Sequence, residues 1–286
     1  MMGINIKYKN NLELNLQGDR FGKTFCQHQY TSYPLRLSPV FRLEGQDSRR
    51  AYLYVINTSP GLLAGDRLNL SVQLAANTEL YLTDQAATKV HQMADIDRSK
   101  ATVSNQIIVN ENASLELVPE PVILYRDSVL EQNTAIALHP TAKLFFSEII
   151  LPGRLAREEY YDFNYYHNRL KIMDLNSNLL FTDVMKLLGK NNFFKDNQIF
   201  TSLPIMGNAI AILPNIDIDK LISFVENPEL IDTYNLEAAA TMLPPKNGIL
   251  IRVLAAKTIN IKQYFTDVLD RIRQLTKQPS LPYIPK

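Results

Sequence analysis

The first two thirds of the chain alternate apolar and polar residues with a period of two, and this pattern limits the fold more than any other feature. Residues 68–74, for example, place Leu, Leu, Val and Leu at every second position, with Asn, Ser and Gln between them. Successive side chains of a β-strand point to opposite faces, so the alternation is typical of strands with one buried face. The sequence therefore predicts a mainly β protein.

Three segments repeat one pattern of strand, polar turn and second strand: 72–82, 107–117 and 136–146. Apolar residues occupy matching places before and after each turn: Leu74, Val109 and Leu138, then Leu80, Leu115 and Leu144. A hairpin-like unit that recurs at roughly thirty residues favours units that stack and cover each other's apolar faces. An ordinary meander also contains hairpins of this length, so the repeat leaves both arrangements open.

The period changes beyond about residue 215. Apolar residues of 261–275 recur at helical spacing, which predicts an amphipathic helix with Asn260 as its N-cap. Residues 217–225 predict a shorter helix that ends before Pro228. We therefore expect one domain over 1–286, with stacked or layered β-sheets over about 1–215 and a small helical or mixed part over about 216–286. The proline-broken segment 281–286 either orders on a partner or frays.

Composition excludes several classes of function. Thirty Lys and Arg residues against 29 Asp and Glu give a net charge of +1, which offers no electrostatic reason to bind nucleic acid. The sequence contains no run of about twenty apolar residues, so it predicts no membrane span. The single cysteine, Cys26, cannot form an intramolecular disulfide, and the first residues lack the pattern of a signal peptide. We therefore expect a cytoplasmic protein.

Four blocks of the sequence carry a family resemblance. They are the glycine turn Gly61-Leu62-Leu63-Ala64-Gly65-Asp66, the polar run from Thr83 to His91, the segment Leu115 to Ile123, and the run from Ser147 to Tyr161. In this order and spacing the blocks resemble the UreD family, also called UreH, of urease accessory proteins. Leu62, Asp84 and Glu158 depart from the residues usual in the family, and these departures bear on local loop shape.

The resemblance implies a fold and a role. The fold would be a two-layered β architecture with helix-like winding. The protein would be no enzyme but a metallochaperone scaffold that acts with UreF and the GTPase UreG, in a dimeric heterocomplex, to insert nickel into the urease apoprotein. Nickel would be in transit rather than tightly bound, and the C-terminal region would contact UreF.

The residues themselves support no catalytic site. Gly61-x-x-x-Gly65-Asp66 lacks the spacing and the lysine of a Walker loop, so nucleotide hydrolysis would belong to UreG. No nucleophile elbow is present, and the four histidines lack ligand spacing. Carboxylates and water hold divalent ions of this kind more loosely than imidazole or thiolate, so we predict no tight metal site.

Asp66, Glu148 and Glu159 are the candidates for lining a nickel passage, because each lies in a matching block. A weak site would let the cation enter and leave. The structural alternatives are that Asp66 caps its own turn and that Glu148 pairs with Arg154. Glu148 lies in the apolar run 144–151, where an acid is costly unless it is paired or hydrated.

Other polar residues of these blocks have structural interpretations. Thr83, Gln85 and Thr88 form a polar cluster at a strand end, with Lys89 either in the turn or beside an acid. Gly153-Arg154 predicts a special backbone angle followed by a guanidinium that ties strands together. The aromatic cluster within 160–166 is either core or a partner surface.

One alternative function stays open at this level. A stacked-β carbohydrate-active hydrolase would use Asp66, Glu148 or Glu159 as paired carboxylates. The chain has no tryptophan, which argues against a sugar-binding cleft. A weaker alternative is a non-catalytic β-rich assembly protein with no role in metal delivery.

Overall fold

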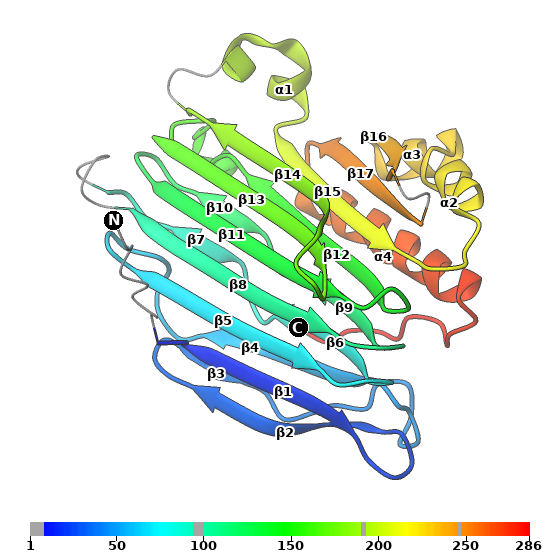
Figure 1. Cartoon of the computed structure of the whole chain (residues 1–286). Coiled ribbons are helices and arrows are strands. Elements are labelled where there is room, and N and C mark those ends of the chain that lie inside the picture. The colour runs from blue at the N-terminus through cyan, green and yellow to red at the C-terminus, as the bar shows by residue number, and fades with distance from the viewer. Residues whose placement is uncertain (1–8, 94–99, 190–192, 245–246) are drawn as a thin grey trace.

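Two β-sheets face each other in the computed structural model, which describes residues 9–93, 100–189, 193–244 and 247–286 (Figure 1). The first sheet has the strand order β14-β13-β11-β8-β5-β1-β2. Its strands are β1 (Leu12–Gly18), β2 (Thr24–Thr31), β5 (Arg67–Leu74), β8 (Ala101–Val109), β11 (Val129–Leu138), β13 (Tyr165–Asp174) and β14 (Leu179–Leu187). The mainly β prediction is confirmed.

The second sheet has the order β16-β17-β15-β12-β9-β6-β4-β3, with β10 beside β12 and β7 beside β10. Its strands are β3 (Leu35–Leu37), β4 (Ala51–Asn57), β6 (Glu79–Asp84), β7 (Thr88–Val90), β9 (Ser114–Val118), β10 (Val122–Leu124), β12 (Lys143–Leu151), β15 (Ile205–Ile212), β16 (Leu236–Met242) and β17 (Gly248–Ala255). The helices are α1 (Gln198–Ser202), α2 (Ile218–Val225), α3 (Pro228–Tyr234) and α4 (Thr258–Leu275), and the 3-10 turns are η1 (Leu155–Arg157) and η2 (Phe193–Asp196).

The three sequence repeats stack on one another, which is the first of the two arrangements that the sequence left open. The first strands of the repeats, β5, β8 and β11, lie parallel in the first sheet, where Val109 pairs with both Leu74 and Leu138. The second strands, β6, β9 and β12, lie parallel in the second sheet, where Leu115 pairs with both Leu80 and Leu144. The hairpin-like description is wrong, because each turn carries the chain from one sheet to the other instead of pairing its two strands.

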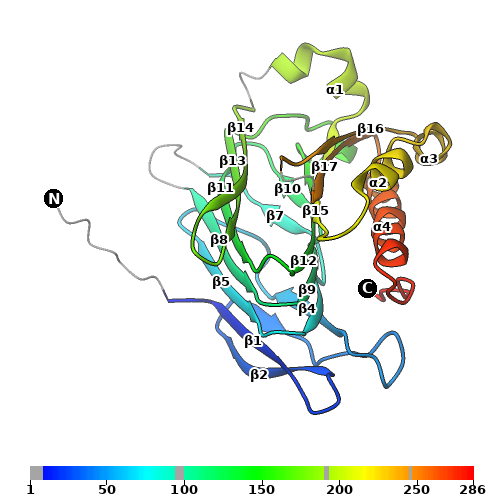
Figure 2. The same ribbon diagram turned by 45° about the vertical axis from the view of Figure 1, so that its right-hand side comes forward.

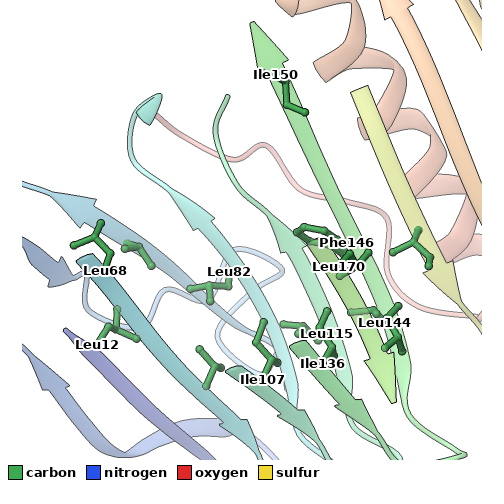
Figure 3. Packing of buried hydrophobic residues seen from close by; sticks show 14 of the residues in the cluster. Leu12, Leu68, Leu82, Ile107, Leu115, Ile136, Leu144, Phe146, Ile150 and Leu170 are labelled. Atoms are coloured by element: carbon green, nitrogen blue, oxygen red, sulfur yellow. The ribbon is translucent and has the colours of Figure 1, made fainter. Parts of the chain in front are cut away.

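Apolar side chains from both sheets fill the space between them (Figure 3). The residues labelled in the figure come from β1, β5, β8, β11 and β13 on one side and from β6, β9 and β12 on the other: Leu12, Leu68, Ile107, Ile136, Leu170, Leu82, Leu115, Leu144, Phe146 and Ile150. The first sheet buries the face that points to this core, which accounts for the period of two along its strands. The second sheet is buried on both faces around β12 and β15, because a second apolar cluster lies on its outer face.

The helices α2, α3 and α4 cover the outer face of the second sheet (Figure 2). The predicted long helix starts earlier than expected, because α4 begins at Thr258 after an N-cap position at Lys257, and Asn260 lies inside its first turn. Pro228 lies after the end of α2, as expected, but it is also the first residue of α3. The N-cap of α3 is Asn227, whose side chain accepts a hydrogen bond from the Glu229 amide. The helical periodicity gave no sign of β16 and β17, which extend the second sheet.

A buried charged network fastens the end of α4 to the second sheet. Arg273 and Arg50 are both completely buried, and each forms ion pairs with Glu44 and Glu116. Arg50 also pairs with Glu79, whose side chain is partly exposed, so the two buried arginines face two buried glutamates and a third at the margin of the network. The network also fixes the C-terminal end of α4 against the second sheet, and the following segment starts from there.

Candidate functional site

A cavity of about 130 Å³ lies between the two sheets. Most of its wall is apolar, and its polar lining residues are Asn57, Thr83, Asp84, Thr88, Asn105, Glu120, Gln132 and Glu148. A single water needs roughly 10–15 Å³ of such space, so the cavity has room for several waters. The polar lining makes it a place where water or a hydrated cation can be accommodated.

Glu148 is a buried acid in this lining. The strand register sets Glu148 of β12 beside Asn208 of β15, and Asn208 beside Arg252 of β17, so the three form one row across the second sheet. From the first sheet, Asn168 donates its side-chain amide to both Glu148 oxygens at 2.7 Å, and Asn208 donates to Oε1 at 3.1 Å. The sheets are thus joined by a polar layer in an otherwise apolar core.

The charge of Glu148 is only indirectly balanced. Its hydrogen-bond partners are neutral amides, while the Arg252 guanidinium donates to Asn208 Oδ1 at 3.0 Å and pairs with Asp183 at 2.8 Å. Burial raises the pKa of Glu148 above its usual value, and hydrogen bonds from Asn208 and Asn168 oppose the shift. A buried carboxylate in this setting favours either a proton or an incoming cation.

A second acidic group lines the cavity where β6 ends. Burial raises the pKa of Asp84 to about 7, even though Lys286 acts in the opposite direction. Burial alone would also raise the pKa of Glu120, but hydrogen bonds from Lys262 and Lys286 outweigh burial and lower it. Sequence reasoning missed Asp84 and Glu120 as cavity residues, although Asp84 stood out as a departure from the family pattern.

Asp66 caps the glycine turn. Its Oδ2 accepts the Leu63 amide at 2.8 Å, and its own amide donates to the Leu63 carbonyl at 3.1 Å. Gly65 has a φ of +84°, and a Cβ on Gly61 would lie 2.5 Å from the Lys89 carbonyl oxygen, so both glycines are required. Asp66 therefore caps its own turn, which is the structural alternative that the sequence offered.

Glu159 pairs with Arg154, which removes the alternative pairing of Arg154 with Glu148. Arg154 Nε lies 2.8 Å from Glu159 Oε2, and the guanidinium also bonds Oε1 and stacks on the Tyr125 ring. Gly153 has a φ of +157°, as the predicted special angle required, and a Cβ there would lie 2.1 Å from the Glu159 carbonyl oxygen. Arg154 therefore closes its own loop instead of tying strands together.

The polar cluster after β6 divides between wall and surface. Thr83 donates to the Val118 carbonyl oxygen at 2.5 Å, and Thr88 lines the cavity. The side chains of Gln85 and Lys89 are exposed. In the aromatic cluster, the residues that are almost completely buried and belong to the core are Tyr161, Phe163 and Tyr166.

An open groove of about 500 Å³ lies near the other side of the polar row. Its polar lining residues are Asn208, Glu237 and Arg252, and its apolar wall includes Met185 and Phe200. Because Asn208 contacts Glu148, the groove and the cavity meet at the same polar row.

Within the described ranges, no three His, Cys, Asp or Glu side chains gather closely enough to hold a metal ion. Nor does any described helix combine the length and apolar character needed to cross a lipid bilayer.

Comparison with known proteins identifies the family. The family model for the UreD urease accessory protein matches residues 9–286. Urease accessory protein UreD of Trichodesmium erythraeum (strain IMS101) is 49% identical over 277 residues, which cover 97% of this chain and 99% of that protein. UreD of Photorhabdus laumondii subsp. laumondii is 29% identical, over 73% of this chain and 65% of that protein. UreD 2 of Brucella canis is 26% identical, over 80% of this chain and 75% of that protein. The chain therefore belongs to the UreD family of urease accessory proteins, and it is an accessory protein rather than an enzyme.

Proposed function

We propose that the protein supports nickel insertion into apo-urease as a non-catalytic conduit, in a cytoplasmic complex with UreF and the GTPase UreG. The observation that carries the conduit is Glu148, a buried carboxylate that lines a cavity and is held by neutral amides. Membership of an accessory family sets aside the hydrolase alternative. The partners and the cargo follow from the family resemblance.

The donor chemistry suits a cation in transit. Carboxylate and amide oxygens bind Ni²⁺ more weakly than imidazole or thiolate does, so the ion is not trapped. Burial raises the pKa of Glu148, so the charged carboxylate is disfavoured in this position, and a passing Ni²⁺ would compensate its charge. Glu148 would therefore lower the electrostatic barrier to a cation in an apolar core.

The route we propose joins two ends of the polar lining. It enters or leaves beside Asp84 and Glu120, passes Glu148, and reaches the groove at Asn208 and Arg252. Asp66 and Glu159 stay predictions for the passage, but they form a separate group in the test, because their hydrogen bonds lie in the glycine turn and the Arg154 loop.

The test is urease activation in cells that express urease with its accessory proteins. We expect Glu148→Gln and Asp84→Asn to lower activation severalfold while UreF still co-purifies. Glu111→Gln is the matched control, since Glu111 is exposed in a turn. Asp66→Ala and Glu159→Ala report on the second group. Full activation by Glu148→Gln with an intact complex would refute the conduit, and failure to capture UreF or urease would refute the assembly.

A further inference from the structure

The segment after α4 folds back onto the body of the protein and ends beside the cavity. Lys286 Nζ donates to Thr83 Oγ1 at 2.8 Å and to the Asp84 carbonyl oxygen at 2.9 Å, and it also pairs with Glu120. All three partners are cavity-lining residues. In Figure 1 the C-terminal end of the chain accordingly lies next to β6.

The Lys286 ammonium occupies a complete cation position. An ammonium has three N–H donors, and the hydroxyl, carbonyl and carboxylate oxygens named above supply an acceptor for each of them. Thr83 suits this role because its own proton goes to the Val118 carbonyl oxygen, which leaves its oxygen free to accept. Oxygen donors of these types are also ligands for hydrated divalent cations.

The base and the tip of this segment are held by different kinds of contact. At the base, Gln278 accepts a bond from the buried Arg50, and the Leu281 amide donates to Asp270 at 2.7 Å. At the tip, the Lys286 side chain remains about 30% exposed while its partner Glu120 is 9% exposed, and Ile284 packs against the outer apolar cluster. The tip is therefore held by an ion pair that is partly screened by salt and by one small apolar contact. Tyr283, between them, is 84% exposed. The tip can therefore detach while the base stays fixed.

We propose that residues 279–286 form a self-inhibitory strap, which closes the Asp84 end of the cavity by placing the Lys286 ammonium where a divalent cation would otherwise bind. This proposal rests on the conduit proposed above and adds its regulation. A cation and the ammonium compete for the same oxygens, so the conduit is closed at this end until the tip is displaced. A partner surface that takes up the tip would open it.

The direct test is Ni²⁺ binding to the full chain, measured by equilibrium dialysis against nickel chloride. Lys286→Met removes the ammonium and keeps the length of the side chain, and we expect it to raise the Ni²⁺ affinity about fivefold. Lys286→Arg keeps the charge and should bind like the wild type. Lys277→Met is the matched control, because it removes an exposed lysine from the base of the segment. Adding Glu120→Gln to Lys286→Met should abolish the gain.

Two results would overturn the strap: equal Ni²⁺ affinity of the wild type and Lys286→Met, or a gain that survives the loss of Glu120. Thermal unfolding of each variant checks that the fold is intact. Because dialysis needs neither urease nor the partners, its outcome is separate from the activation test. Increased binding by Lys286→Met together with full activation by Glu148→Gln would keep the competition between the ammonium and the cation but refute the conduit that the strap regulates. The opposite pair of results would keep the conduit and refute the strap.

Discussion

Arg273 in the last turn of α4 binds Glu116 of β9 through two parallel hydrogen bonds, Nε to Oε1 at 2.9 Å and Nη2 to Oε2 at 2.5 Å. Arg273 is completely buried, and its Nη1 also reaches Glu44 at 2.9 Å. Burial alone would lower the pKa of Arg273, but the bonds to Glu116 raise it, so the guanidinium stays charged. This contact ties the end of α4 to the second sheet.

Removing one member of this pair should therefore destabilise the protein strongly. Arg273→Met leaves the Glu116 charge buried with Arg50 as its remaining ion-pair partner, and we expect the free energy of unfolding to fall by about 3–5 kcal/mol. Urea unfolding followed by circular dichroism measures it. Arg157→Met, at an exposed position, should change stability by less than about 0.5 kcal/mol. A loss of similar size in both variants would show that the network contributes little.

Asp84 should make stability fall as the pH rises. Its folded pKa of about 7 lies above the usual aspartate value of 3.8, so the folded state binds the proton more tightly than the unfolded state does. The wild type therefore loses stability relative to Asp84→Asn between about pH 4 and pH 7, and the difference is constant above that range.

The size of this effect is modest because Asp84 is only half-buried. We expect Asp84→Asn to be more stable than the wild type by about 1–2 kcal/mol at pH 8 and by almost nothing below pH 4. Denaturant unfolding at a series of pH values gives the curve. Asp232→Asn, at an exposed position in α3, should give a difference that does not vary over this range. A flat curve for both variants would contradict the raised pKa.

Asn168→Asp should place a second carboxylate against Glu148. Two like charges at hydrogen-bond distance cannot both be ionised cheaply, so one of them should keep a proton to high pH. We expect a stability loss of about 2–4 kcal/mol at pH 8 that shrinks markedly at pH 5. The control is Asn133→Asp on the exposed side of β11. Equal, pH-independent losses in both variants would mean that Asn168 and Glu148 are not in contact.

Gly153→Ala should open the Arg154 loop. The added Cβ would lie 2.1 Å from the Glu159 carbonyl oxygen, and the φ of +157° is one that other residues rarely adopt. Gly45→Ala separates the two causes, because Gly45 has a φ of +104° with no atom within 4 Å of the added Cβ. We expect Gly153→Ala to lose about 2 kcal/mol more than Gly45→Ala in thermal unfolding. Similar losses would show that the loop relaxes freely.

Local pattern predicted much of the fold. The alternation along β5 and β6 and the matched leucines of the repeats indicated stacked strands, since these depend on which residues one strand must bury. The pattern could not tell a hairpin from a turn that crosses between sheets, because both join two amphipathic strands through a short polar segment. β16 and β17 were not predicted, because they lie between helices in the sequence and add to an edge that only the assembled sheet provides.

The candidate site was only partly accessible from sequence. Glu148 attracted notice as an acid in an apolar run, and Gly153 and the glycine turn were explained by backbone requirements. The sequence offered no reason to place three other residues at the site: Asp84, Glu120 and Lys286. An acid after a strand or a lysine in a proline-broken segment is common, and only contacts with distant segments give these residues a special position.

The sequence by itself determined which faces of the strands are buried, where the special glycines lie and which family the chain resembles, because these are short-range or pattern properties. The tertiary structure alone decided that Asn168 holds Glu148, that Arg273 meets Glu116 and that Lys286 reaches Thr83, because the partners are 20, 157 and 203 residues apart. Contacts at such separations follow from strand register for Asn168 and from the packing of α4 and the segment after it for Arg273 and Lys286, and these become fixed only when the sheets and helices assemble.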